Sequence, residues 1–187
     1  MKSKFRMFVV LALTITSVTG CAFGTRHPLL GYTPVVKGSG PKNVTLYVEK
    51  FKDERTDKNI IGNVRNGWGL KTADVITDTT IAEWVTDAFK TELGNDGYVV
   101  SKDRTELTAG GEVITVYCDS YLQYEGNVTL GVVLKKGDQV ILDKKYTGKA
   151  TNFNWAATAK SYGLTVEQSL QSAMKQILTD VDQALAS

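Results

Sequence analysis

Residues 112–149, EVITVYCDSYLQYEGNVTLGVVLKKGDQVILDKKYTGK, decide the fold of this 187-residue chain. Apolar and polar residues alternate through most of this segment, as expected of strands with one buried face. Gly126 and the pair Gly137-Asp138 are residue types that favour tight turns, and they divide the segment into three parts. We therefore predict an antiparallel meander with strands at residues 112–124, 127–135 and 139–149.

Shorter elements surround this meander. Alternation predicts three short strands, at residues 44–48, 70–76 and 98–101. Apolar residues at helical spacing predict two helices, each apolar on one face, at residues 81–93 and 165–186. Asp78 or Thr79 is the expected cap of the first helix. Residues 52–69 are polar and are expected to form a long loop.

This order of elements predicts an α+β fold, a two-layer sandwich whose mostly antiparallel sheet has two helices packed on one face. The other face should be unusually exposed. Its expected residues are Thr115, Tyr117, Asp119, Tyr121, Gln123, Thr129 and Val133. Tyrosines in such a row either stabilise cross-strand pairs or form a recognition surface, and both alternatives remain open.

The N-terminus has the pattern of an export signal that ends at a lipidation site. Three basic side chains precede an apolar stretch at residues 7–15, which is too short to span a bilayer. Residues 18–21, Val-Thr-Gly-Cys, resemble the cleavage site of bacterial lipoproteins. That resemblance implies removal of residues 1–20 and attachment of acyl chains to Cys21. The alternative is an ordinary cleaved signal that leaves Cys21 as a free thiol.

In such lipoproteins the residue after the acylated cysteine is a sorting signal that selects the inner or the outer membrane. An aspartate there favours retention in the inner membrane, whereas this chain has Ala22. The resemblance therefore implies delivery to the outer membrane of a Gram-negative bacterium, with the domain on the periplasmic face. The acyl chains would make the membrane itself a partner.

Composition limits the domain count and the partners. Residues 1–20 hold three basic and no acidic side chains, so their removal changes the formal charge from +2 to about −1. No run of basic residues interleaved with aromatics remains, which argues against nucleic acid as a partner. Residues 21–43 hold all three prolines and the one histidine, and we expect a lipidated cysteine followed by a flexible tether. Residues 44–187 are then a single domain.

Cys118 has no partner for an intramolecular disulfide once Cys21 is acylated. The alternation of its strand places it on the more apolar face. We therefore predict a small buried hydrophobic residue, because a reactive thiol needs an electropositive and partly exposed setting.

The densest polar constellation begins at Asp53 and ends at Trp68. Its candidate residues are Asp53, Arg55, Asp57, Arg65, Asn66 and Trp68. The carboxylates do not have the spacing of a calcium loop, and Arg55 would neutralise them. Three interpretations remain open: a structural loop with Arg55 clamping a carboxylate, a partner-binding loop, and a metal or catalytic site. Phosphate loops, metal-ligand spacings and nucleophile elbows are absent, so no catalytic residue, metal or cofactor is predicted.

The chain also resembles the YajG-like lipoproteins of Gram-negative bacteria. The resemblance rests on four short motifs, Asp53-Glu54-Arg55-Thr56-Asp57, Ile61-Gly62-Asn63-Val64-Arg65, Gly97-Tyr98-Val99-Val100 and Asn127-Val128. It implies a lipid-anchored periplasmic domain without an established activity, and it supplies no catalytic residues.

These observations favour a non-catalytic accessory or binding module of the outer membrane that contacts another envelope component. Two alternatives remain. The first is a protein that binds or hydrolyses cell-wall carbohydrate through the loop at residues 53–57. The second is a self-assembling ring of anchored subunits, which would make a second copy of the chain its partner.

Overall fold

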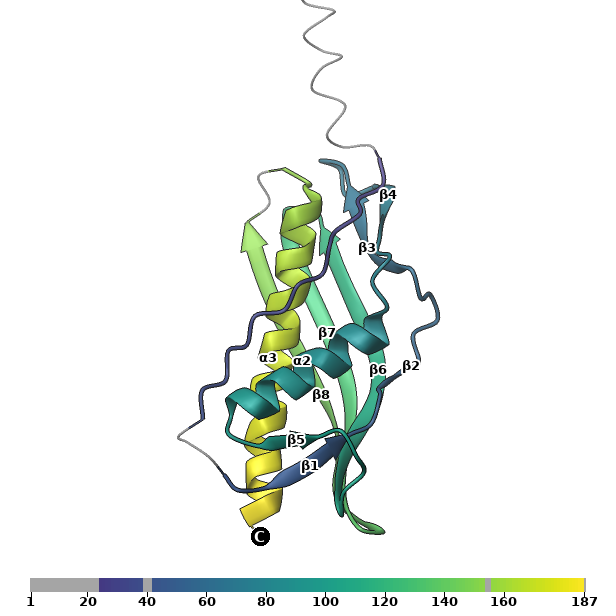
Figure 1. Ribbon diagram of the computed structural model, residues 1–187. Coiled ribbons are helices and arrows are strands. Elements are labelled where there is room, and N and C mark those ends of the chain that lie inside the picture. Colours follow the sequence, from purple (N-terminus) through teal and green to yellow (C-terminus); the bar gives the residue numbers. More distant parts are fainter. Residues whose placement is uncertain (1–23, 39–41, 154–155, 187) are drawn as a thin grey trace, which may run out of the picture.

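The computed structural model describes residues 24–38, 42–153 and 156–186, so the predicted signal peptide and Cys21 lie outside the described residues. The elements are β1 (Thr45–Val48), β2 (Lys52–Asp53), β3 (Ile60–Arg65), β4 (Lys71–Ile76), α2 (Ile81–Asn95), β5 (Val99–Ser101), β6 (Leu107–Ser120), β7 (Gln123–Lys136), β8 (Gln139–Phe153) and α3 (Ala159–Ala186). The strands form one 8-stranded sheet with both helices on one face, which confirms the α+β prediction (Figure 1). Neither helix combines the length and apolar character that a bilayer span requires within the described ranges.

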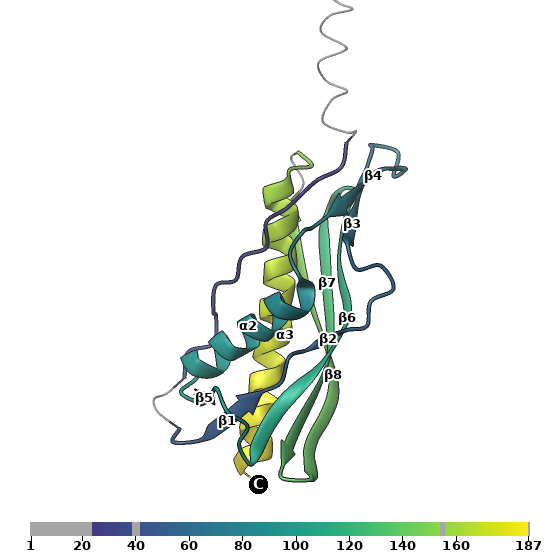
Figure 2. The same cartoon turned by 45° about the vertical axis from the view of Figure 1, so that its right-hand side comes forward.

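Strand β6 organises the sheet. It forms the predicted antiparallel meander with β7 and β8. It also pairs in parallel with β1, β2 and β3, while β4 is antiparallel to β3 and β5 is parallel to β1. The sheet is therefore mixed. Figure 2 shows the meander with both helices on one side and the opposite face uncovered.

A β-bulge at Ile114 changes which residues of β6 face the helices. Val113 pairs with Leu130 and Thr115 pairs with Thr129, so Ile114 is an extra residue in this strand. Inward-facing positions before the bulge are Leu107, Ala109 and Val113, and those after it are Val116, Cys118 and Ser120. The predicted unbroken alternation from residue 112 is wrong at this point, because Val113 is buried and Ile114 is half-buried.

The predicted turn at Gly126 is also wrong. The turn joining β6 to β7 is formed by Tyr121 and Leu122, and Gly126 lies inside β7 beneath α3. A Cβ atom at Gly126 would lie 2.8 Å from the carbonyl oxygen of Thr165. Glycine is needed there because the helix backbone approaches the strand closely. The turn at Gly137, where φ is 58°, is confirmed.

Three other boundaries differ from the sequence prediction. The expected loop at residues 52–69 contains β3, which pairs with β4 and β6. Helix α2 has Thr80 as its N-cap, without a side-chain cap hydrogen bond, and not Asp78 or Thr79. Helix α3 begins at Ala159, earlier than residue 165, and the hydroxyl of Thr158 accepts a hydrogen bond from an amide of its first turn.

Residues 24–38, which we call the strap, lie along the domain and do not form a free tether (Figure 1). At its start, Arg26 forms a parallel bridge with Val75 of β4. The amide of Arg26 donates to the carbonyl of Asp74 at 3.1 Å, and the amide of Ile76 donates to the carbonyl of Arg26 at 2.8 Å. The prediction that this segment contributes nothing to the core is therefore wrong for residues 24–38.

One buried carboxylate of α2 holds the rest of the strap. Glu92 is 0% exposed and accepts hydrogen bonds from the amides of Val35 and Val36, each at 2.9 Å. It also accepts a hydrogen bond from the Tyr32 hydroxyl. Burying a carboxylate is costly unless donors satisfy it, and here the strap supplies them. Leu30, Tyr32 and Val36 pack against the core from the same segment.

Cys118 is fully buried, which confirms its predicted place in the core. Burial raises the pKa of its thiol to about 12, so the reactive thiolate is scarce at neutral pH. We expect slow labelling of Cys118 by a maleimide in the native protein and rapid labelling in denaturant, measured by mass spectrometry. Fast labelling of the native state would contradict this placement.

Candidate functional site

Arg55 clamps Asp53, as one interpretation of the sequence predicted. Its Nε and Nη2 atoms donate to the two carboxylate oxygens of Asp53 at 2.9 and 2.8 Å. Nη2 also donates to the carbonyl of Lys58 at 2.6 Å, and the Arg55 residue is only 6% exposed. A guanidinium that is bidentate and buried fixes the loop, so these contacts are structural.

Asp57 is engaged within its own loop. Its carboxylate accepts hydrogen bonds from the amides of Asn59 and Ile60, both at 3.1 Å. Such bonds from an aspartate to following amides stabilise a turn. The carboxylates of Asp53 and Asp57 are therefore both committed to the loop that leads into β3.

The remaining three candidates shape the turn between β3 and β4. Arg65 forms an ion pair with Asp119 of β6 at 2.7 Å and donates to the carbonyl of Gly69 at 2.9 Å. The side chain of Asn66 accepts from the amide of Trp68 at 3.0 Å. Trp68 itself is 85% exposed.

The structure thus separates the predicted constellation into two groups. Asp53 lies beside Val113 of β6, whereas Val64 lies beside Ser120 near the end of the same strand. Seven residues of extended strand span about 23 Å. The two groups are far apart because β3, which the sequence analysis treated as loop, runs between them.

The ion pair between Asp53 and Arg55 makes the stability of the domain depend on pH. Burial alone would raise the pKa of Asp53. The hydrogen bonds and the charge of Arg55 lower it by more than burial raises it, so the pKa lies below its usual range. A folded-state pKa below the unfolded value of about 3.9 stabilises the domain above that pH. This stability is lost as the pH falls through the folded-state pKa.

We therefore expect Asp53→Asn to lower the free energy of unfolding at pH 7, and the difference between parent and variant to shrink as the pH falls from 5 to 3. Urea unfolding at pH 7, 5 and 3 measures this difference. A difference that stayed constant over these three pH values would show that the charge of Asp53 is not what stabilises the loop.

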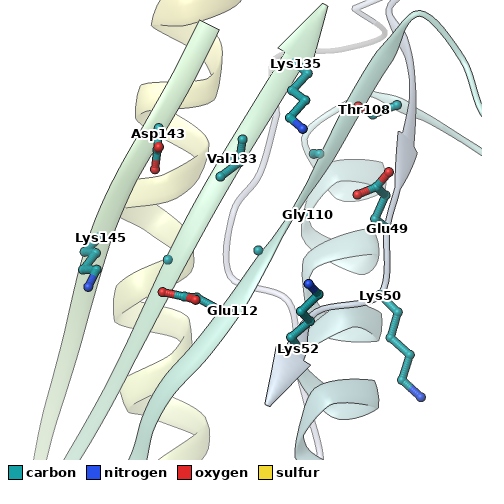
Figure 3. A pocket seen from close by; sticks show the side chains of 13 residues that line it. Glu49, Lys50, Lys52, Thr108, Gly110, Glu112, Val133, Lys135, Asp143 and Lys145 are labelled. Carbon is teal, nitrogen blue, oxygen red and sulfur yellow. The ribbon is translucent and has the colours of Figure 1, made fainter. Parts of the chain in front are cut away.

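A hollow on the uncovered face of the sheet was not predicted. Its volume is about 370 Å³, and Figure 3 shows the side chains that line it. Glu112, Gly131 and Lys145 are neighbours in one row across β6, β7 and β8. Gly110 and Gly131 supply no side chains to fill the space. A Cβ atom at Gly131 would lie 2.9 Å from Cγ of Glu112, so the glycine lets this side chain lie over β7.

Charged side chains of both signs surround this hollow. They are Glu49, Lys50, Lys52, Glu112, Lys135, Asp143 and Lys145. Glu49 pairs with Arg104 at 3.1 Å and Lys50 pairs with Glu83 at 2.6 Å. The side chains of the other five form no hydrogen bond or ion pair with another described residue. These five side chains are therefore available to a partner.

The chemistry of the hollow suits binding through charge and shape. Acidic Glu112 and basic Lys145 lie on either side of Gly131, so a partner with groups of both signs could satisfy both. In the described ranges no three His, Cys, Asp or Glu side chains are grouped to hold a metal ion.

Sequence reasoning missed this site because its residues are spread over 97 positions, from Glu49 to Lys145, and meet only through strand register. The one local signal was the set of glycines at 110, 111 and 131 within apolar strands. An isolated glycine in a strand indicates a bulge or a close approach, and here two of them leave a surface hollow.

No protein-family model matches the chain, and no curated protein does. Protein XCC0632 from Xanthomonas campestris, of family DUF330, has a TM-score of 0.61 at 14% identity, covering 88% of this chain and 99% of that chain. A second solved structure, of an uncharacterized protein, has a TM-score of 0.53 at 10% identity, covering 84% and 99%. Lipoprotein GNA1162 from Neisseria meningitidis gives 0.38 at 13% identity, covering 76% and 98%, a likeness too weak to argue from. The resemblance to YajG-like lipoproteins stays a prediction, and the chain is similar in fold to XCC0632.

Proposed function

We propose that this protein is a lipid-anchored, non-catalytic accessory module of the outer membrane that binds another envelope component through the uncovered face of its sheet. The observation that carries the proposal is the glycine-floored hollow at Gly110 and Gly131. A sheet with one face in solvent ordinarily covers that face with a continuous layer of side chains. Here Gly110 and Gly131 interrupt the layer, and charged side chains of both signs that form no ion pair with a described residue surround the gap.

The anchor and the periplasmic location come from the sequence. The Val-Thr-Gly-Cys pattern at residues 18–21 supports acylation, and Ala22 supports delivery to the outer membrane. The open face supports binding because Glu112, Lys135 and Lys145 lie on it without a side-chain partner among the described residues. Surfaces of complementary charge give specificity and speed to an encounter.

A photo-crosslinking amino acid at Val133, which lines the hollow, tests the proposal in intact envelopes. We expect a discrete adduct that is lost in Gly131→Gln, because the new side chain fills the hollow. Its nearest neighbour, Glu112, is flexible and can move aside, so the fold should persist. Thr151→Gln, an exposed change on the same face but outside the hollow, is the matched control.

An adduct that survives Gly131→Gln, or no adduct from folded protein at Val133, would overturn the proposed binding face. An adduct with a second copy of the chain would instead support the ring of subunits. Release of soluble fragments from purified cell wall by the protein would contradict the non-catalytic role and favour the hydrolytic alternative.

A further inference from the structure

Apolar side chains are exposed together at one end of the sheet. They lie in the β3–β4 turn, in the β6–β7 turn and at the end of β8, and they are Trp68, Leu70, Tyr121, Leu122 and Phe153. Trp68, Leu122 and Phe153 are 85%, 73% and 78% exposed. We call these five residues the aromatic end. Most of the exposed large apolar side chains in the described ranges belong to it, and such a concentration indicates an interaction surface.

These side chains form one surface. Trp68, Tyr121 and Leu122 line a common hollow of about 580 Å³. Phe153 pairs with Gln123, the residue that follows Leu122, so it lies one strand farther along the same end. The two turns and the end of β8 therefore lie at the same end of the sheet (Figure 1).

Several hydrogen bonds fix the backbone of the turn that carries Trp68. The side chain of Asn66 accepts from the amides of Trp68 and Leu70, both at 3.0 Å. Arg65 donates to the carbonyl of Gly69, and the left-handed conformation of Gly69 (φ 79°) closes the turn. These hydrogen bonds stabilise a turn whose tryptophan side chain is exposed to solvent.

The chain reaches the predicted acylation site from this same end. Arg26 pairs in parallel with Val75, so the strap followed back from Arg26 to Gly24 runs along β4 toward Lys71 and the turn of Trp68. Cys21 is five residues before Arg26. Five residues span at most about 18 Å, so an acyl chain on Cys21 keeps this end near the bilayer.

We propose that the aromatic end docks on the lipid bilayer, with Trp68, Tyr121, Leu122 and Phe153 in its interfacial region. Tryptophan and tyrosine favour the interface, and leucine and phenylalanine add buried apolar area. Two nearby cations are paired, since Arg65 pairs with Asp119 at 2.7 Å and Lys71 pairs with Asp74 at 2.5 Å. The carboxylate of Glu125, which also lines the hollow, accepts a hydrogen bond from the side chain of Gln123 at 2.9 Å. Docking of this end is separate from the binding proposed for the open face.

Quenching of tryptophan fluorescence by brominated lipid tests this docking. The mature acylated protein is reconstituted into vesicles of phosphatidylethanolamine and phosphatidylglycerol that contain dibrominated phosphatidylcholine. The difference between parent and Trp68→Phe isolates the emission of Trp68, because Trp84 and Trp155 are common to both. We expect at least half of that emission to be quenched, together with a shift to shorter wavelength.

Val140→Trp in the Trp68→Phe protein is the matched control. Val140 is 50% exposed and pairs with Lys135 at the far end of the meander. The twelve residue-to-residue steps from Gln123 to Lys135 span about 40 Å of strand, which exceeds the half-thickness of a bilayer. A tryptophan there should stay unquenched. Leu122→Asp, an exposed change in a turn, should reduce the quenching of Trp68 at least two-fold.

Absent quenching of Trp68, or equal quenching at positions 68 and 140, would overturn the docking. A Trp68 that is unquenched in vesicles but forms crosslinks to a protein in envelopes would also overturn it, and would assign this end to a protein partner. The vesicles contain no other protein, so the result does not depend on whether the open face binds anything.

Discussion

Gly148→Val should be severely destabilising, with a loss of at least about 3 kcal/mol in the free energy of unfolding. Gly148 lies in β8 directly beneath α3. An added Cβ atom would lie 2.0 Å from the carbonyl oxygen of Ser169 and 2.4 Å from the amide nitrogen of Ala173. These are backbone atoms of a long helix, so they cannot move aside as a flexible side chain would. The helix must lift from the sheet, and the contacts of its buried face weaken.

Thermal unfolding followed by circular dichroism measures this loss, and we expect the midpoint to fall by roughly 10 °C. Gly67→Ala is the control, because a Cβ atom at Gly67 would meet nothing within 4 Å. That variant should match the parent or be slightly more stable. Equal midpoints for Gly148→Val and Gly67→Ala would show that α3 does not pack on β8 as described.

Glu92→Ala should release the strap from the domain. The substitution removes the acceptor for the amides of Val35 and Val36 and for the Tyr32 hydroxyl. Each donor left unpaired while buried costs about 1–3 kcal/mol, so the strap gains by detaching into water. We expect the free energy that favours the attached strap over the detached strap to fall by about 3 kcal/mol. Trypsin should then cleave rapidly after Lys37, while the sheet stays folded.

Limited proteolysis and hydrogen exchange of residues 24–38 measure the release. Glu92→Gln keeps a carbonyl acceptor of similar shape and should be intermediate. Glu83→Ala is the matched control on the same helix, because Glu83 is 59% exposed and pairs with Lys50, which is also 59% exposed. Equal protection of the strap in Glu92→Ala and Glu83→Ala would contradict the role given to Glu92.

What the sequence predicted correctly depends on short-range patterns. The meander follows from alternation within each strand, and the clamp of Asp53 by Arg55 joins residues two positions apart. The burial of Cys118 follows from the parity of its own strand after residue 114. In each case the residues that set the structure lie close together in the chain.

What the sequence analysis missed depends on distant pairs. The bulge at Ile114 is visible only in the register with β7, because one extra residue leaves both halves of the strand alternating. The strap has no periodicity of its own, since its amides bond to a carboxylate more than fifty positions away. The hollow needs three strands in register before Glu112, Gly131 and Lys145 become neighbours.

The bridge between Arg26 and Val75 also decides how this protein can search for a partner. Cys21 lies only five residues before the bridge, so acyl chains on Cys21 would keep the domain close to the membrane surface. The domain would then diffuse laterally with its anchor in one leaflet. Its strands would stand up from the bilayer, so the hollow would face sideways, within about 45 Å of the lipid. Encounters would then be two-dimensional. A partner fixed in the same membrane would meet the hollow at a high effective concentration, whereas one that stays farther from the lipid would never reach it.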